Sequence, residues 1–460
     1  MICYFNFKKI NDHYLITNDL GRYMFLSKAE LQSLFLNQVD TTSEFGKTAV
    51  ENFFYYDGSI QAFSEQLKPY MRDSKSYLFS ATSLHIFVVT NRCNMNCVYC
   101  QARTGSATPI GMMTEDVAKR AVDIALSAPS KYLTFEFQGG EPLLNFPIIK
   151  YIVEYAASKQ QDKIIEYNIV SNLTLLTDEM IDFIRAHQIG ISTSLDGGAA
   201  LHDKNRTYST GTGTFTDVQC GIQRLRTSGI RVGAIETTTR SSLGSAKQII
   251  DTYQALDMPS IFLRPLTPLG QAKERWEEIG YTPAEFVAFY RECFRHLMEL
   301  NTSGIPIREG HASIVLSKIL TGRAANYMEL RSPCGAGIGQ IAYYYDGNVY
   351  TCDEGRMLAE MGNDAFQLGS VFKNSYDDFM NASACKVACV SSILESLPKC
   401  SDCVYNPYCG TCPVVNLALY GNVYAKEAND YRCQIYQGIF DTIFAALQHP
   451  EAAKILHTWV

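Results

Sequence analysis

The sequence predicts an α/β protein, and two observations carry the prediction. Between residues 84 and 264, short apolar runs alternate with amphipathic stretches at about one pair per 30 residues, the size of a βαβ unit. That rhythm predicts parallel strands with right-handed crossovers, in an open partial barrel or a doubly wound sheet. Cysteines are also clustered, three within residues 93–100 and nine within 334–433. We therefore expect three regions: a small α+β unit at 1–82, the βα region at 83–300 and a cysteine-rich region at 301–460.

The strands of the βα region are expected where β-branched and aromatic residues form short runs. These runs are Leu84–Thr90, Tyr132–Phe137, Ile164–Val170, Ile189–Leu195, Ile230–Glu236 and Ser260–Arg264. The amphipathic stretches between them are expected to be helices: Glu115–Leu126, Phe146–Ala157, Asp178–Ala186, Phe215–Thr227 and Leu243–Leu256. In both candidate architectures, ligands bind at the C-terminal ends of the strands.

The flanking regions have simpler local signals. In the N-terminal unit, His13–Ile16 and Tyr23–Leu26 are expected strands, and a capping box at Ser27-Lys-Ala-Glu opens a helix that runs through Leu36. The polar stretch Ser64–Lys75 is expected to be a linker. In the C-terminal region, aromatic residues around an Asp-Gly turn predict a hairpin at Tyr343–Tyr350.

Composition excludes several classes of protein. Hydrophobic residues make up 47% of the 460 positions, which rules out a disordered chain. A net charge of −7 provides no basic surface for nucleic acid. The apolar runs are shorter than the ~20 residues that span a bilayer, and the first residues show no signal peptide. We expect a cytoplasmic protein without a membrane part, in which clustered thiols hold metal rather than form disulfides.

Cys93, Cys97 and Cys100 form a C-x3-C-x2-C motif directly after the first predicted strand. Three thiolates in one loop can hold three irons of a cubane cluster and leave the fourth iron open. The alternative is a zinc site with a distant fourth ligand. Tyr99, an aromatic residue before the last cysteine, and the position at a strand end both favour the cluster.

With these flanks, the chain resembles the radical S-adenosylmethionine (SAM) enzymes. Their cubane binds SAM and cleaves it to a 5′-deoxyadenosyl radical, and Gln138-Gly-Gly-Glu-Pro142 matches the family motif that holds the SAM amino group. The resemblance also implies ribose contacts from Ser171 and Asn172 and carboxylate contacts from Ser194 and Arg206, although helix caps or turns are equally good explanations of the first three. The residues expected at SAM are Tyr99, Gln138, Gly139, Gly140, Glu141, Ser171, Asn172, Ser194 and Arg206.

The C-terminal cysteines resemble the SPASM extension of the same superfamily. Cys334, Gly347 and Cys352 fit its first part, C-x9–15-G-x4-C, and the run from Cys400 to Cys412 fits C-x2-C-x5-C-x2–3-C. The resemblance implies two auxiliary clusters, hence three 4Fe–4S clusters in all. One would be held by Cys400, Cys403, Cys409 and Cys433, and the other by Cys334, Cys352 and Cys412. For the second, Cys385 and Cys389 are candidates to complete the ligands, or one iron stays open for substrate.

Asp353 follows Cys352 directly. In sulfatase maturases of this superfamily the aspartate at this position is the catalytic base, so the resemblance implies that role for Asp353. A base is needed because a substrate radical must lose a proton and an electron to reach a closed-shell product. The alternatives are a solvated turn residue or an ionic partner for Arg356.

The resemblance covers about residues 84–433 and implies a peptide or protein maturase. Phe87-Val-Val-Thr, Asp353–Met357 and Cys403–Cys412 are most similar to maturases of His-Xaa-Ser peptide systems (HxsB-like), which implies cross-linking of a ribosomally made peptide. Expected partners are a precursor peptide bound by the N-terminal unit, a flavodoxin- or ferredoxin-type electron donor and a second radical SAM enzyme. The alternatives are an anaerobic sulfatase maturase forming formylglycine and, in another class, a non-catalytic iron–sulfur electron carrier or zinc scaffold.

Overall fold

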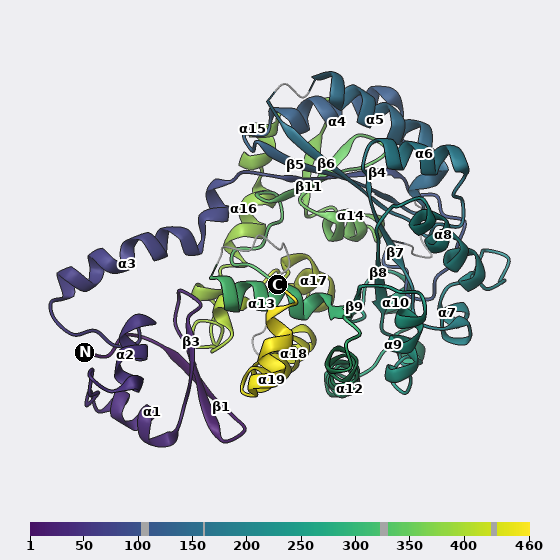
Figure 1. Cartoon of the computed structure of the whole chain (residues 1–460). Coiled ribbons are helices and arrows are strands. Elements are labelled where there is room, and N and C mark those ends of the chain that lie inside the picture. Colours follow the sequence, from purple (N-terminus) through teal and green to yellow (C-terminus); the bar gives the residue numbers. More distant parts are fainter. Residues whose placement is uncertain (103–109, 160–161, 323–329, 425–429) are drawn as a thin grey trace.

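The computed structural model describes residues 1–102, 110–159, 162–322, 330–424 and 430–460. A curved ten-stranded sheet in the order β10-β9-β8-β7-β6-β5-β4-β11-β12-β13 forms its centre, and a separate sheet holds β1, β2 and β3 (Figure 1). Strands β4 to β10 are parallel, as the βα rhythm predicted. The central strands are β4 Leu84–Thr90, β5 Tyr132–Gly139, β6 Ile164–Val170, β7 Gly190–Ser194, β8 Val232–Thr237, β9 Ser260–Arg264 and β10 Arg308–Glu309.

Helices connect these strands on the outer side of the sheet (Figure 1). They are α4 Glu115–Ser127, α5 Phe146–Lys159, α6 Asp178–Ala186, α7 Ala199–Asn205, α8 Phe215–Thr227, α9 Ala246–Ala255, α10 Gln271–Glu274, α11 Trp276–Ile279, α12 Pro283–Thr302 and α13 Gly310–Thr321. The six predicted strands are all present. Two elements that the sequence did not predict follow α12: α13 and the two-residue strand β10, which is too short to produce a sequence pattern.

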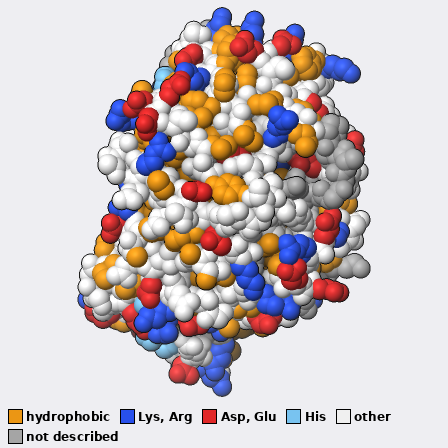
Figure 2. All heavy atoms as spheres, turned by 90° about the vertical axis from the view of Figure 1, so that its right-hand side faces the viewer, with side chains coloured by type: hydrophobic (Ala, Val, Ile, Leu, Met, Phe, Trp, Pro, Cys, Tyr) orange, Lys and Arg blue, Asp and Glu red, His pale blue; other side chains and the backbone are white. Residues whose placement is uncertain are grey.

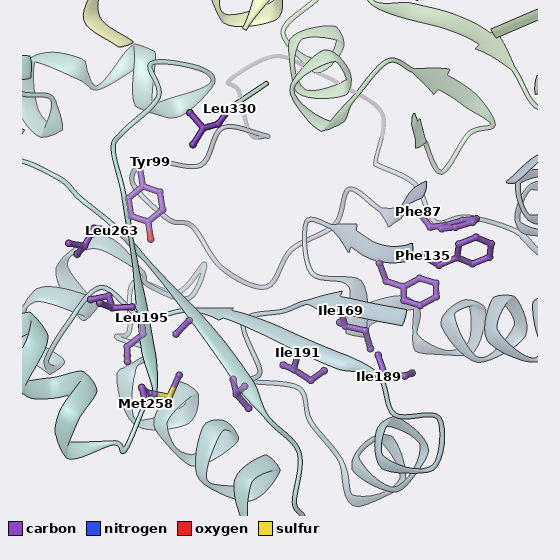
Figure 3. Close-up of a cluster of buried hydrophobic side chains, with 14 of the residues drawn as sticks. Phe87, Tyr99, Phe135, Ile169, Ile189, Ile191, Leu195, Met258, Leu263 and Leu330 are labelled. Carbon is purple, nitrogen blue, oxygen red and sulfur yellow. The ribbon is translucent and has the colours of Figure 1, made fainter. Parts of the chain in front are cut away.

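The cysteine-rich region extends the same sheet. Strand β11 pairs in parallel with β4, so Tyr343 lies beside Phe87, and the predicted hairpin then adds β12 and β13 antiparallel. Figure 3 shows part of the core that the barrel strands share, in which the rings of Phe87 and Phe135 lie next to each other at a tilt. The region's elements are β11 Gln340–Tyr343, β12 Asn348–Tyr350, β13 Gln367–Ser370, α14 Asp353–Glu360, α15 Tyr376–Asn381, α16 Ser383–Val390, α17 Pro413–Tyr420, α18 Tyr431–Leu447 and α19 Pro450–His457.

The N-terminal unit consists of β1 Asn6–Ile10, β2 His13–Thr17, β3 Tyr23–Leu26 and the helices α1 Lys28–Phe35, α2 Glu44–Glu51 and α3 Ile60–Ser74. The capping box at Ser27 is formed as predicted. The linker expected at Ser64–Lys75 is wrong, because this stretch belongs to α3, which Ser59 caps by accepting a hydrogen bond from the Ala62 amide. No residue of α3 is buried, so the helix lies along the outside of the chain (Figure 1).

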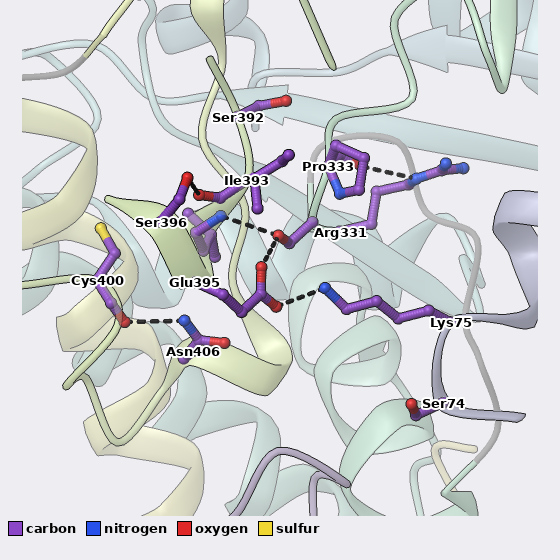
Figure 4. Close-up of polar contacts among 12 residues, drawn as sticks. Ser74, Lys75, Arg331, Pro333, Ser392, Ile393, Glu395, Ser396, Cys400 and Asn406 are labelled. Carbon is purple, nitrogen blue, oxygen red and sulfur yellow. Dashed lines mark hydrogen bonds and ion pairs between the residues drawn. The ribbon is translucent and has the colours of Figure 1, made fainter. Parts of the chain in front are cut away.

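The N-terminal sheet packs against the last cysteine loop and α18. The buried Thr17 hydroxyl donates to the Val404 carbonyl at 2.6 Å, and the rings of Tyr23 and Phe25 contact Phe444. After α3, Lys75 forms an ion pair with Glu395, as Figure 4 shows. The first and last regions of the chain are therefore joined by a buried hydrogen bond and edge-to-face ring contacts.

The surface mixes charges of both signs. On the face in Figure 2, Lys and Arg side chains alternate with Asp and Glu, and neither sign forms a broad patch. Within the described ranges, none of the helices combines the length and the apolar character that a membrane span needs.

Candidate functional site

The first cysteine loop follows β4 and is held against the end of β5 by two glycines. The Gly140 amide donates to the Thr90 carbonyl at 2.9 Å, and the Glu141 amide donates to the Arg92 carbonyl at 2.7 Å. A Cβ atom on Gly139 would lie 2.3 Å from the Thr90 oxygen, and one on Gly140 would lie 2.2 Å from the Arg92 oxygen. Only glycine permits this approach, which gives the Gly-Gly-Glu sequence a structural reason.

Two further segments hold the other side of this loop. The amides of Asn96 and Val98 donate to carbonyls of residues 207 and 205, and the Gln271 amide donates to the Cys100 carbonyl. These contacts come from the ends of α7 and α10, so three separate parts of the barrel determine the path of the loop. The three cysteines are therefore presented on a braced loop rather than on a free one.

The three thiols of this loop influence one another. Burial raises the pKa of Cys93 to about 12, and the charges of Glu141, Cys97 and Cys100 add to the rise. Burial likewise raises the pKa of Cys100 to about 11, again with a contribution from Cys97. A metal must displace these protons, and a grouping of three neighbouring thiols is a donor set that iron or zinc selects.

Glu141 joins the ends of β5 and β6. Its carboxylate accepts hydrogen bonds from the Leu143 amide at 3.0 Å, the Ser171 hydroxyl at 2.8 Å and the Asn172 amide at 2.8 Å. Burial raises the pKa of this carboxyl group, and the hydrogen bonds oppose that shift. A carboxylate has about four acceptor positions, so one remains for a ligand ammonium group. The structure thus brings together three residues that were predicted at the SAM site.

Tyr99 and Arg206 form a buried network with Asp196, a residue that the sequence motifs did not single out. The Tyr99 hydroxyl donates to the Asp196 carboxylate at 2.8 Å, and Nη1 of Arg206 donates to the Tyr99 oxygen at 2.9 Å. Figure 3 shows the Tyr99 hydroxyl turned toward the end of β7 near Leu195. Nε of Arg206 is buried without a hydrogen-bond partner, which leaves a cationic donor for a ligand carboxylate. Asp196 follows Ser194-Leu at a strand end, and that position was the available signal.

The remaining residues predicted at SAM lie at or near the C-terminal ends of two strands. Ser194 is the last residue of β7 and is half-buried. Gln138 lies near the end of β5, and its amide donates to the Glu136 carboxylate at 2.5 Å. The charges of Asp353 and Arg264 both act on the pKa of Glu136, which burial raises. Glu136 and Arg264 therefore lie on the Asp353 side of the barrel interior, and no sequence motif singled out either residue.

Helix α14 connects the first cysteine loop with the second cysteine group. Cys352 is its N-cap, and its side chain accepts a hydrogen bond from the Gly355 amide at 3.3 Å. Farther along the helix, the charges of Arg356 and of the last residue, Glu360, act on the pKa of Cys100. Eight residues of helix span about 12 Å, so the two cysteine groups are about one short helix apart.

Asp353, the candidate base, is at the start of α14. Arg356 is 1% exposed and forms ion pairs with Asp353 and, at 2.9 Å, with Glu360. One alternative role expected for Asp353, as an ionic partner of Arg356, is therefore present in the structure. The Asp353 side chain nevertheless keeps 15% of its surface exposed, on the side of the barrel that contains Glu136.

Cys334, Cys352 and Cys412 line one cavity with Glu354 and Arg432. Burial raises the pKa of Cys334 to about 11 and raises that of Cys352 and Cys412 strongly. The three come from different segments of the chain, and their assembly matches the ligand set that the SPASM resemblance implied. The three thiols and Glu354 carry negative charge when they are ionised. The positive iron–sulfur core of a cluster compensates such charges, and buried charges need compensation.

Cys400, Cys403, Cys409 and Cys433 form a third group at the start of α18. Burial raises the pKa of Cys409, and the charges of Cys403, Cys433 and Cys400 raise it further. Burial raises the pKa of Cys433 to about 12, again with contributions from Cys403 and Cys400. Ten cysteines thus lie in three groups whose members are those that the resemblance implied. Within the described ranges no group of His, Cys, Asp or Glu has the geometry of a finished metal site, so the sets are neighbouring thiols.

Four of the remaining cysteines have other surroundings. Cys385 and Cys389 lie one turn apart on α16 and interact with each other, which lowers the pKa of Cys385 and raises that of Cys389. Cys220 and Cys293 lie in predicted helices, where small buried residues are expected; Cys293 is buried in α12, but Cys220 is exposed, so that prediction is wrong for Cys220. Cys220 lies on the solvent side of α8, whose buried residues are Val218, Gly221, Ile222 and Leu225.

Comparison with known proteins places this site in a family. Residues 87–244 match the model of the Radical SAM superfamily. The uncharacterized protein MJ0907 of Methanocaldococcus jannaschii is 32% identical over 183 residues, 40% of this chain and 62% of that protein, so less than two thirds of that relative is spanned. The cysteine-type anaerobic sulfatase-maturating enzyme of Clostridium perfringens is 23% identical over 379 residues, 79% of this chain and 97% of that enzyme.

Solved structures share the fold. Native anSMEcpe with bound AdoMet has a TM-score of 0.70 at 19% identity, covering 82% of this chain and 99% of that chain. Streptococcus suis SuiB bound to precursor peptide SuiA has a TM-score of 0.55 at 14% identity, covering 92% and 98%. The chain contains a radical SAM domain and is homologous to anaerobic sulfatase-maturating enzymes. The predicted resemblance and the α/β fold class are confirmed, and the radical SAM fold implies a 4Fe–4S cluster and SAM.

Proposed function

We propose that the protein is a radical SAM maturase that removes hydrogen from a side chain of a peptide or protein, an oxidoreductase reaction. The observation that carries the proposal is the sorting of ten cysteines into three groups, the first and second of which are joined by α14. A non-catalytic electron carrier or a zinc scaffold has no use for Glu141 and Arg206 converging beside the first group. Maturases named among the relatives support the same class.

In this proposal the first cysteine group holds the cluster that binds SAM, and the other two groups hold auxiliary clusters. Bound cluster and SAM supply a deoxyadenosyl radical that takes a hydrogen atom from the substrate. Glu141 accepts from the SAM ammonium group, the free Nε of Arg206 donates to the SAM carboxylate, and Ser171, Asn172 and Ser194 lie at the neighbouring strand ends. Tyr99 is a positioning residue, because it holds Arg206.

Asp353 is the proposed catalytic base. It lies beside Cys352 and on the same side as Glu136, so a substrate between β5 and α14 meets both a carboxylate and the second cysteine group. Arg356 must release Asp353, or share it, when the proton is taken, because a carboxylate that is fully paired is a weaker base. Glu360 remains as the second partner of Arg356 in that step.

The N-terminal unit is the proposed site for a leader peptide. Its three-stranded sheet has edges at β1 and β3 and can take an added strand from a peptide by β-augmentation. The likeness to SuiB, solved with a precursor peptide, extends over 92% of this chain. The proposed division remains 1–82, 83–300 and 301–460. A second radical SAM enzyme and a flavodoxin- or ferredoxin-type donor are proposed partners, in the cytoplasm.

Cross-linking in a His-Xaa-Ser (HxsB-like) system is the proposed outcome, and formylglycine formation is the second candidate because sulfatase-maturating relatives span most of the chain. Anaerobic enzyme with SAM is incubated with two peptides, one rich in His and Ser with its leader, and one sulfatase segment with Cys or Ser. If the enzyme forms a cross-link, the mass of the His- and Ser-rich peptide falls by two hydrogen atoms and no aldehyde appears. A hydrazide-reactive aldehyde in the sulfatase segment favours the second candidate, and absence of deoxyadenosine with every peptide contradicts both.

A further inference from the structure

The second cysteine group has three thiols, whereas a cubane cluster has four irons. Cys334, Cys352 and Cys412 account for three ligands, so a fourth ligand or an open iron is required. The question rests on the proposed auxiliary cluster at this group. The structure contains two candidates for the missing ligand: the pair Cys385 and Cys389, and the carboxylate of Glu354.

Glu354 lies among the three thiols. It is in the first turn of α14, two residues after Cys352, and lines the same cavity as Cys334, Cys352 and Cys412. Its charge acts on all three thiols, and among the neighbouring charges it has the largest effect on each of them. No other carboxylate within the described ranges lines this cavity. The side chain is 19% exposed, so most of it is removed from bulk solvent.

The electrostatics of the cavity favour a bound cation. Four acidic groups around one cavity repel each other when ionised, and burial adds a desolvation cost to each charge. Arg432 lines the cavity, and Arg264 forms a long ion pair with Glu354 at 3.9 Å. Two guanidinium groups offset part of four negative charges, and a cluster core with positive irons offsets the rest.

The cysteine pair of α16 has a different environment. Cys385 and Cys389 interact with each other, and Sγ of Cys385 is 2.5 Å from the position of a Cβ on Gly337. Neither cysteine lines the cavity. The close approach of Cys385 to Gly337 instead places this side of α16 against the loop after Cys334.

We propose that the carboxylate of Glu354 is the fourth ligand of the cluster held by Cys334, Cys352 and Cys412. A bond from the Glu354 oxygen to the fourth iron completes the cluster without any redox change. Replacement of thiolate by a neutral or oxygen donor generally raises the reduction potential of an iron–sulfur cluster. An oxygen-ligated cluster beside Asp353 is thus suited to accept an electron when the substrate loses its proton.

The test uses full-length protein, reconstituted anaerobically. Four variants are compared with the wild type: Glu354→Gln, Glu354→Cys, Arg264→Gln and the double change of Cys385 and Cys389 to Ser. Iron content, EPR spectra before and after mild oxidation, and the potentials of the reduced clusters are measured. We expect Glu354→Gln to lose about one of the four irons of this group on oxidation and to show the EPR signal of a three-iron cluster. Glu354→Cys is expected to keep all irons and to lower the potential of this cluster.

The other two variants are matched controls. Arg264→Gln removes the ion pair of Glu354 without removing the carboxylate, and the double serine variant removes the rival ligands; both are expected to keep the iron content and the EPR spectrum of the wild type after mild oxidation. A wild-type spectrum in Glu354→Gln, iron loss in the serine variant, or the same three-iron signal in Arg264→Gln overturns the inference. A separate variant, Cys352→Ser, tests the cluster itself: no loss of iron there contradicts the proposed auxiliary cluster and not only its fourth ligand.

Discussion

The first and second cysteine groups are assembled in opposite ways. Cys93, Cys97 and Cys100 come from one eight-residue loop at the strand ends, and Cys93 is exposed. Cys334, Cys352 and Cys412 come from distant segments, and the first two are buried. A group within one loop remains accessible to a ligand that must enter and leave, whereas a group built from distant segments is closed by the fold. The difference matches a proposed SAM site and a proposed electron-storing site.

The supports of the two groups differ as well. The first loop is held by backbone hydrogen bonds to the ends of β5, α7 and α10, so side-chain changes far away leave it in place. The second and third groups depend on packing between regions, including the N-terminal sheet beside the last cysteine loop. We therefore expect substitutions at the first group to change SAM cleavage. Substitutions near the second and third groups are expected to change how firmly those groups retain iron.

The largest effect is expected when the first group is removed. The triple change of Cys93, Cys97 and Cys100 to Ala should leave about two thirds of roughly 12 irons per chain and abolish SAM cleavage, because the other two groups lie on separate segments. Iron, labile sulfide and deoxyadenosine are measured in anaerobic protein. Stoichiometric zinc without sulfide in the wild type would contradict the cluster proposal for both regions.

Asp353→Asn tests the residue between the two groups. It keeps shape but removes basicity, so iron content and deoxyadenosine formation should persist while modified product falls by about 10²- to 10⁴-fold. Glu360→Gln is the matched control, because it removes the other carboxylate partner of Arg356. If both variants lose product equally, the effect comes from the ion pairs. Product at the wild-type rate in Asp353→Asn means that this residue is not the base.

Gly140→Ala tests whether the first loop depends on backbone contact. The new Cβ would lie 2.2 Å from the Arg92 carbonyl oxygen, so we expect a loss of roughly 1–3 kcal/mol in unfolding free energy and weaker SAM binding. Gly244→Ala is the control, since no atom lies within 4 Å of its Cβ position. Thermal unfolding and SAM titration report the two effects. Equal stability of the two variants would show that the loop adapts to the extra methyl group.

Thr17→Val has the smallest expected effect and probes the third group from a distance. The change removes the buried hydrogen bond to the Val404 carbonyl and should cost about 1 kcal/mol. We also expect faster iron loss to a chelator from the Cys400–Cys433 group, with SAM cleavage unchanged. Thr227→Val removes an exposed helical hydrogen bond and serves as the control. Unchanged chelation kinetics would mean that the N-terminal sheet does not support this group.

Local patterns predicted the barrel well because its strands and helices repeat at regular intervals. All six strands from Leu84 to Arg264 form, and the Tyr343–Tyr350 hairpin forms. The patterns failed where an element is short or polar. Strand β10 has only two residues, too few to show a periodicity. In α3, Ile60, Phe63 and Leu67 recur at helical spacing, but polar residues separate them and no residue of the helix is buried, so its composition resembles that of a linker.

The sequence by itself determined the C-x3-C-x2-C loop and the position of Gly-Gly-Glu at a strand end, because spacing and local backbone preference are properties of neighbouring residues. The members of the two later cysteine groups were implied only by the SPASM resemblance, since Cys412 lies between Cys409 and Cys433 in the chain. Only the tertiary structure decided which side chains from distant segments meet. It placed Glu354 in one cavity with three thiols, and Asp196 beside Tyr99. The pairing of β11 with β4 joins the cysteine-rich region to the barrel sheet, and no pattern along the chain records that pairing, because it depends on residues more than 200 positions apart.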